Sequence, residues 1–224
     1  MKYTIISCSP QNEKRSSSTC IAHIFKKVVE KEASNQTSLF AISNKNTWCE
    51  VRNSFYESDM TVFVIPVYVE NVPGLFLEFL STLESRENLG KIAFIIQGGF
   101  EEASQLRTTE MFLEKLPQRL NCEYKGTLIR GGMFGMATMR GTKFRGYMEQ
   151  EFERAIERFL VKNEFDKQLQ MEFAGNEYYS KAMIVLGKIS KPLNFMVWNI
   201  IAKKMGVNGK LTDKPYARDV VRME

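Results

Sequence analysis

The feature that most constrains the fold is a continuous apolar run at residues 60–65, MTVFVI, which ends at Pro66. An apolar run without alternating polar positions is typical of a central parallel strand, because such a strand is buried on both faces of its sheet. In a parallel sheet, helices cover those faces. The run therefore predicts an α/β fold with helices on both sides of a sheet.

Strand-like and helix-like segments alternate around this run. We expect strands at residues 2–6, 37–42, 60–65, 91–97 and 124–130. We expect helices after residue 19, at 48–58, from Pro73, at 103–120 and from Phe144 or Tyr147 to 161. The fourth helix should turn Thr109, Phe112, Leu113, Leu116 and Leu120 inward. Five such pairs imply a parallel sheet with right-handed crossovers and a ligand crevice beyond the carboxyl ends of the strands.

The first of these carboxyl ends leads into a loop rich in hydroxyl groups. Ser9 follows the first strand, and a run of four, Ser16, Ser17, Ser18 and Thr19, precedes an amphipathic helix. Backbone N–H groups and the dipole at a helix N-terminus favour an anion, and hydroxyls add donors. The alternative is a plain helix N-cap, for which one hydroxyl suffices. We therefore predict a phosphate site here.

The loops after the third and fourth strands have unusual compositions. The third loop is apolar where a solvated connection would be polar, and it contains Pro66, Val67, Tyr68, Val69, Asn71 and Val72. The fourth loop opens with Gln97, Gly98 and Gly99. The first composition suits the wall of a flat ring system, and two glycines let a backbone approach a ligand closely. A loop tucked under its neighbours and a simple tight turn are the alternatives. With the phosphate site, the three loops suit a phosphorylated planar cofactor such as FMN.

At this point the sequence resembles the flavodoxin-like NAD(P)H-dependent FMN reductases and quinone reductases. The motifs that carry the resemblance are Ser9-Pro10, the hydroxyl run at 16–19, Pro66-Val67-Tyr68 and Pro73-Gly74. They fall within residues 1–162, and the chain departs from the usual pattern at Cys8, where Gly is common, and at Gln11, where a basic residue is common.

The resemblance implies a three-layer sandwich with strand order 2-1-3-4-5. It also implies bound FMN, a hydride from NADH or NADPH, and a small acceptor such as a quinone, a flavin or a nitroaromatic. The residues expected at the cofactor are Ser9, Ser16, Ser17, Ser18, Thr19, Pro66, Val67, Tyr68, Val69, Asn71, Gln97, Gly98 and Gly99. The flavin supplies the chemistry in such proteins, so we nominate no catalytic acid or base. A homodimer is also expected from the resemblance.

Several other classes are disfavoured by what the sequence lacks. Four cysteines without C-x-x-C spacing and the single His23 do not make a metal site, so no metal is expected. No acidic pair follows the first strand, as a phospho-acceptor domain needs, and neither G-x-G-x-x-G nor a P-loop is present. No nucleic-acid motif, signal peptide or membrane-spanning run is visible, so we expect a cytoplasmic protein. Cys8 suits a buried apolar residue better than a nucleophile.

Residues 163–224 exceed what a five-strand domain needs and are expected to form a helical extension. From Lys181 onward there are nine Lys and Arg against three Asp and Glu. Around Trp198 the segment is apolar nearly all round, with Leu193, Phe195, Met196, Val197, Ile200 and Ile201. Such a helix must be buried on more than one side. We expect it to pack on its own core or on a twin subunit, and the alternative is a membrane surface. A non-catalytic module or electron carrier that docks through this basic tail remains the alternative function.

Overall fold

The computed structural model describes residues 1–133, 136–137, 139, 141–204 and 206–213. Contacts within the chain divide it into two compact units, Met1–Tyr178 and Tyr179–Glu224.

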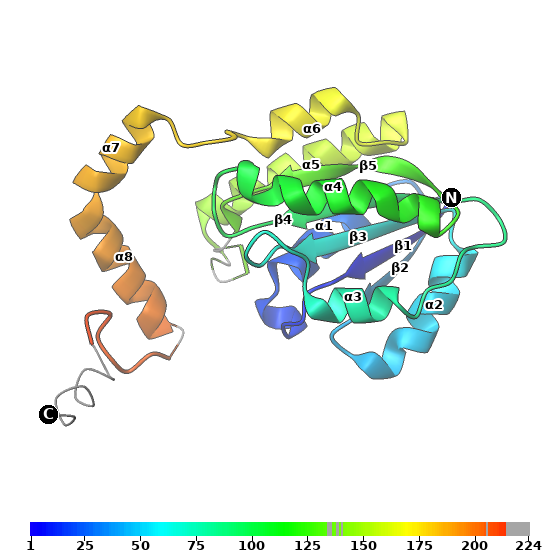
Figure 1. Ribbon diagram of the computed structural model, residues 1–224, viewed down its shortest axis with the longest axis horizontal. Coiled ribbons are helices and arrows are strands. Elements are labelled where there is room, and N and C mark those ends of the chain that lie inside the picture. Colours follow the sequence, from blue (N-terminus) through cyan, green and yellow to red (C-terminus); the bar gives the residue numbers. More distant parts are fainter. Residues whose placement is uncertain (134–135, 138, 140, 205, 214–224) are drawn as a thin grey trace, which may run out of the picture. The chain divides into compact units, whose positions relative to one another are not determined.

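The first unit is built on a five-stranded parallel sheet (Figure 1). Its strands are β1 (Lys2–Ser7), β2 (Gln36–Ala41), β3 (Met60–Pro66), β4 (Gly90–Gln97) and β5 (Cys122–Arg130). They lie in the order β2-β1-β3-β4-β5, which confirms the predicted topology. The helices of this unit are α1 (Ser17–Val29), α2 (Trp48–Glu57), α3 (Gly74–Leu80), α4 (Ser104–Arg119), α5 (Lys143–Lys162) and α6 (Lys167–Ala174). Short 3-10 turns occupy Glu13–Arg15 (η1) and Lys45–Thr47 (η2).

The sheet separates two hydrophobic cores, and strand β3 contributes to both. Every residue of β3 is buried. Val62 and Val64 belong to the core that α1, α5 and α6 cover. Phe63 and Ile65 belong to the core that α2, α3 and α4 cover. The apolar run at residues 60–65 is therefore a central strand buried on both faces, as predicted.

The inward face of α4 differs from the prediction at one residue. Thr109, Leu113, Leu116 and Leu120 are buried as expected, but the side chain of Phe112 is 42% exposed. The buried residues lie at spacings of three and four and form one stripe, and Phe112 lies beside it. The prediction that Phe112 faces inward was therefore wrong. It was based on the apolar character of Phe112, whereas the helical period places this residue beside the buried stripe.

The first unit extends beyond residue 162, where the sequence suggested that the domain ends. The N–H of Phe165 donates to the carbonyl of Lys125 in β5 at 2.8 Å. Gly126 next to it has a φ of 90°, and a Cβ there would meet the carbonyl oxygen of Phe165 at 2.3 Å. The N–H groups of Ala103 and Ser104 then donate to the carbonyls of Asn176 and Glu177. Residues 163–178 are therefore part of the α/β unit.

The second unit contains α7 (Lys181–Ile189) and α8 (Lys191–Lys204), joined at Ser190. The N–H of Ser190 donates to the carbonyl of Leu186, and the carbonyl of Ser190 accepts from the N–H of Asn194, both at 2.9 Å. One residue therefore ends one helix and begins the next. Among the described helices, none is both long enough and apolar enough to cross a membrane.

The difference in burial between Phe63 and Phe112 predicts unequal losses of stability when each is replaced by alanine. Phe63 is fully buried, and its ring lies against those of Phe55, Phe76 and Phe94. Phe63→Ala should lower the free energy of unfolding by about 3–5 kcal/mol. The matched variant Phe112→Ala should lower it by less than about 1 kcal/mol. Urea unfolding measures both, and equal losses would contradict the described packing.

Candidate functional site

Three loops predicted to bind a cofactor meet at the carboxyl edge of the sheet. The N–H of Cys8, after β1, donates to the carbonyl of Val64 in β3 at 2.8 Å. The N–H of Val67, after β3, donates to the carbonyl of Gln97 in β4 at 2.8 Å. The N–H of Gly98 donates in turn to the carbonyl of Arg130 in β5 at 3.0 Å. The ladder of the parallel sheet thus continues into the loops and holds them side by side.

The four hydroxyls at residues 16–19 have intramolecular partners. Ser16 is the N-cap of α1, and its Oγ accepts the N–H of Thr19 at 3.1 Å. The hydroxyls of Thr19 and Ser7 share a hydrogen bond of 2.8 Å. The Oγ of Ser18 accepts from Nε2 of Gln97 at 3.3 Å. Among the four residues, only Ser17 is not buried, and its Oγ donates to the carbonyl of Met133 at 3.1 Å.

The N-terminus of α1 nevertheless keeps backbone donors. No hydrogen bond between described residues uses the N–H of Ser17 or of Ser18. The N-terminus of α4 is different, because the carbonyls of Asn176 and Glu177 already accept the N–H groups of Ala103 and Ser104. Of these two helix starts, α1 offers the free N–H groups and positive dipole end that suit a phosphate.

Ser9, which the sequence also placed at the cofactor, supports the first loop from inside. It is buried, and its Oγ accepts the N–H of Gln11 at 3.2 Å. This bond between residues two apart makes a tight turn at the start of the loop. The loop then runs through η1 to Ser16.

The loop after β3 forms a tight hairpin at the same edge. Tyr68 and Asn71 exchange two backbone hydrogen bonds, with N–H to carbonyl distances of 2.9 and 3.2 Å. The two residues between them, Val69 and Glu70, have φ values of 49° and 62°. Positive φ at both central positions is the geometry of a type I′ turn, where Asn and Gly are usual. A β-branched residue there is strained.

The hairpin presents an apolar surface. Val69 is 96% exposed, and Tyr68 is also exposed, whereas Val67 and Val72 are buried. Asn71 accepts the N–H of Val72 through its Oδ1 at 2.8 Å. The exposed side chains of Tyr68 and Val69 could contact a flat ring, and that contact stays a prediction. Pro66 and Val67, by contrast, anchor the loop in the core.

The loop after β4 packs closely against the loop after β5. The carbonyl of Gly98 accepts the N–H of Met133 at 2.9 Å, and the carbonyl of Phe100 accepts the N–H of Gly132 at 2.8 Å. A Cβ on Gly131 would meet the carbonyl oxygen of Phe100 at 2.3 Å. At Gly99, in contrast, no atom lies within 4 Å of the position a Cβ would take. Gly99 therefore leaves open space at the site edge, where a ligand can approach the backbone.

The surroundings of Cys8 disfavour a nucleophilic role. Its side chain is fully buried, and burial raises the pKa of the Cys8 thiol well above its usual value. The thiolate is the nucleophilic form of cysteine. The apolar reading of Cys8 from the sequence is confirmed.

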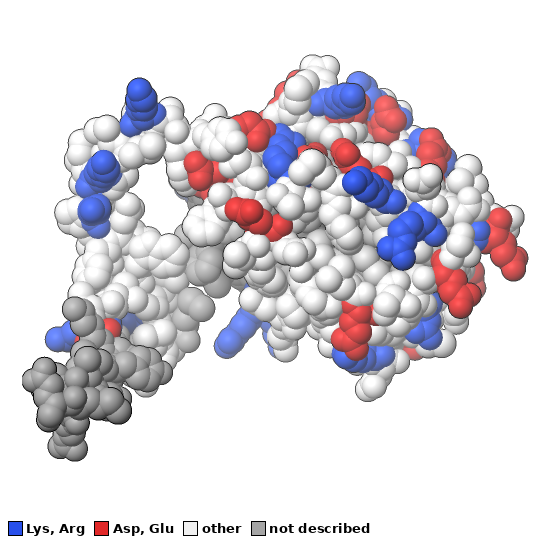
Figure 2. Space-filling model, in the orientation of Figure 1, with Lys and Arg blue, Asp and Glu red and all other residues white. Residues whose placement is uncertain are grey.

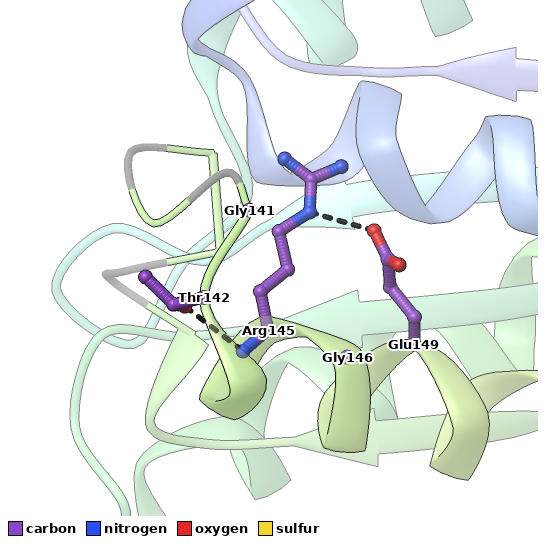
Figure 3. A pocket seen from close by; sticks show the side chains of 5 residues that line it. All are labelled: Gly141, Thr142, Arg145, Gly146 and Glu149. Carbon is purple, nitrogen blue, oxygen red and sulfur yellow. Dashed lines mark hydrogen bonds and ion pairs between the residues drawn. The ribbon is translucent and has the colours of Figure 1, made fainter.

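A cleft of about 470 Å³, which was not predicted from the sequence, lies at the start of α5. Gly141, Thr142, Arg145, Gly146 and Glu149 line it (Figure 3). Nε of Arg145 donates to Oε1 of Glu149 at 2.6 Å, and Nη1 of Arg145 is buried without a hydrogen-bond partner among the described residues. The i, i+4 spacing of Arg145 and Glu149 was visible in the sequence and could have indicated the ion pair. The pairing leaves little net positive charge for an anion.

No protein-family model matches the sequence, and no curated protein matches it. Solved structures do match. An FMN-dependent NADH-azoreductase from Bacillus anthracis, in complex with FMN, is 15% identical, with a TM-score of 0.50 over 70% of this chain and 98% of that one. An NAD(P)H:quinone oxidoreductase from Methanothermobacter marburgensis is 13% identical, with a TM-score of 0.54 over 72% of this chain and 97% of that one. RosB, with bound 8-demethyl-8-formylriboflavin-5'-phosphate, is 14% identical, with a TM-score of 0.54 over 86% of this chain and 87% of that one.

At such low sequence identities, the structural similarity to these proteins establishes the fold alone. The chain has the flavodoxin-like fold, and its structural neighbours are reductases of that fold. The expected fold class is confirmed, and the resemblance to flavodoxin-like reductases is confirmed at the level of the fold. The role of each predicted site residue stays a prediction.

The strain in the hairpin can be measured. Val69→Asn should raise the free energy of unfolding by about 1 kcal/mol, because Asn tolerates positive φ far better than a β-branched residue. The matched control is Val161→Asn in α5, where Val161 is 87% exposed in ordinary helical backbone. The control should change stability by less than about 0.5 kcal/mol. Thermal unfolding compares the two, and a destabilised Val69→Asn protein would contradict the described turn.

The burial of the thiols makes a second prediction. Cys8, Cys20 and Cys122 are buried, and Cys49 is exposed. A thiol reagent at neutral pH should label Cys49 rapidly and the other three only as the protein unfolds. Cys49→Ser should therefore abolish the fast phase, and Cys8→Ala should leave it intact. Mass spectrometry of labelled peptides identifies the site, and rapid labelling of Cys8 in the folded protein would contradict its burial.

Proposed function

We propose that this protein is an FMN-dependent oxidoreductase that passes a hydride from NADH or NADPH, through bound FMN, to a small acceptor such as a quinone, a flavin or a nitroaromatic. The observation that supports this most strongly is the meeting of three loops at one sheet edge, each with a different part of an FMN site.

The N-terminus of α1 supplies the phosphate part. The N–H groups of Ser17 and Ser18 lack partners among the described residues, and the dipole of a 13-residue helix adds to their pull on an anion. The hydroxyls of Ser16, Ser18 and Thr19 hold this helix start in place through bonds to the Thr19 N–H, to Gln97 and to Ser7. The site is therefore preorganised before an anion arrives.

The hairpin after β3 and the glycines after β4 supply the ring part. Exposed Tyr68 and Val69 provide apolar surface for a planar ring, and the open space at Gly99 lets the ring edge approach a backbone N–H. The hydrogen bond from the N–H of Val67 to the carbonyl of Gln97 fixes one loop against the other.

When bound, FMN supplies hydride transfer chemistry that no side chain can perform. The residues of this chain bind and orient it, and the apolar wall keeps water from the face where a nicotinamide would stack. Apolar surfaces of this kind favour flat organic molecules. The acceptor classes named above share that flat shape.

The backbone donor at Ser17 gives a sharp test of the phosphate site. Ser17 is the first residue of α1 after the N-cap, where proline is tolerated, and Ser16 before it is extended, as proline requires. Ser17→Pro removes the N–H and the hydroxyl, and Ser17→Ala removes the hydroxyl alone. A hydrogen bond to a charged group contributes about 1.5–3 kcal/mol, so Ser17→Pro should weaken FMN binding by about 10- to 100-fold. Ser17→Ala should weaken it much less.

Riboflavin, which lacks the phosphate, is the ligand control. Its affinity should be the same for both variants and the wild-type protein, as measured by quenching of flavin fluorescence. Equal weakening of FMN and riboflavin would place the phosphate elsewhere. If the wild-type protein fails to bind FMN at micromolar concentration, the oxidoreductase proposal is lost, and the non-catalytic alternative takes its place.

A further inference from the structure

The second unit has a composition unlike the rest of the chain. Residues 179–212 contain six lysines and no aspartate or glutamate. The lysines are Lys181, Lys188, Lys191, Lys203, Lys204 and Lys210. The first 180 residues, in contrast, carry 22 basic and 23 acidic side chains and are nearly neutral. The positive charge of the protein is therefore concentrated on one short helical segment.

The same segment exposes large apolar side chains. Helix α7 has no buried residue, although six of its nine residues are apolar and not glycine. The exposed fractions of the large apolar side chains on the surface of α7 and α8 range from 41% at Val197 to 72% at Ile189. The exposed large apolar residues are Ile184, Val185, Leu186, Ile189, Phe195, Met196, Val197, Trp198 and Ile200. A surface of this kind on a folded protein marks an interaction site.

The lysines are arranged around this apolar surface. Lys181 and Lys188 are seven residues apart in α7, so they lie on one face of the helix, two turns apart. Lys191 begins α8, and Lys203 and Lys204 end it. Figure 2 shows lysines and no acidic residue on the visible face of α7 and of the start of α8. Long lysine side chains can keep their charges in water while their stems lie along apolar surface.

The charge pattern distinguishes the classes of partner. A second copy of this segment would bring lysines against lysines, with no acidic residue between 179 and 212 to compensate them. The nearly neutral first unit of a second copy offers no excess of negative charge either. An anionic lipid surface has a partner for each kind of side chain in this segment. Its acyl chains suit the apolar side chains of the helices, and its phosphate groups suit the lysines.

We propose that residues 179–212 bind the surface of an anionic membrane, with the apolar side chains of α7 and α8 at the headgroup boundary and the lysines at the lipid phosphates. The helices lie on the bilayer and do not cross it, because α8 has 14 residues and a span needs about 20. Trp198 suits this boundary, where tryptophan is enriched in membrane proteins.

Trp198 provides the first readout on the full-length protein. The chain has two tryptophans, and Trp48 is buried in the first unit, where its Nε1 donates to the carbonyl of Ile42. In a Trp48→Phe variant, emission therefore reports on Trp198 alone. Vesicles of phosphatidylcholine with phosphatidylglycerol should shift this emission to the blue and protect it from acrylamide. Vesicles of phosphatidylcholine alone should have a much smaller effect.

Charge reversal provides the second readout. The triple variant Lys181→Glu, Lys188→Glu, Lys191→Glu should sediment with the anionic vesicles at least about tenfold less tightly, since each lysine near such a surface contributes about 1 kcal/mol. The matched control reverses three exposed lysines of the first unit, Lys115, Lys143 and Lys167, and should bind as the wild type does. Equal loss in both variants would overturn the proposal, because it would show that only net charge matters.

The alternative partner has its own outcome. If Trp198 is already protected without vesicles, and becomes accessible as dilution dissociates a dimer, the segment binds a second copy and the proposal is overturned. Flavin binding is measured separately on the same variants. The membrane proposal does not depend on the flavin, so failure of either proposal leaves the other testable.

Discussion

The first unit depends on one constraint, the parallel pairing of β3 with β1 on one side and β4 on the other. Parallel neighbours need crossover connections, and these are the helices that bury both faces of the sheet. Parallel pairing also brings every carboxyl end to the same edge. The loops that follow β1, β3, β4 and β5 therefore meet there whatever their sequences, and only their residues decide what chemistry that edge performs.

The hydroxyl groups of the first loop also connect the start of α1 to the sheet, and their predicted contact with a phosphate stays a prediction. Ser18 reaches Gln97 in β4, Ser17 reaches the carbonyl of Met133 after β5, and Thr19 reaches Ser7 in β1. Three side chains thus fix the start of α1 to three different strands or their loops. Ser16 and Ser18 accept in their described bonds, so their O–H groups remain as donors beside the backbone N–H groups of Ser17 and Ser18. The hydroxyls thus make the start of α1 rigid, which is a second way in which they would favour the proposed phosphate.

The sequence alone predicted a helix or strand correctly where one physical signal dominated the segment. The apolar run of β3 and the period of α1 have a single interpretation. β3 ends one residue beyond its predicted end, and α1 begins three residues before its predicted start. The predicted inward face of α4 was wrong at Phe112, because an apolar residue next to a buried stripe is easily taken for part of that stripe. The turn at Val69 and Glu70 contradicts the preference of both residues, so no local pattern could predict its positive φ values. Docking of residues 163–178 depends on Gly126, whose role appears only when β5 and Phe165 are next to each other.

From the sequence alone, residues 179–212 could be buried against protein or could contact a membrane, because apolar content does not identify a partner. A helix that is apolar nearly all round can be buried by protein or by lipid. Charge separates these possibilities, since a protein interface must place an acidic group near each buried lysine or leave the lysine at its rim. Residues 179–212 contain no acidic group, and their lysines stand at both ends of α8 as well as along α7. The near neutrality of the first unit agrees with this proposal, because a protein held at an anionic surface by one basic segment would need no attraction from the rest of its chain.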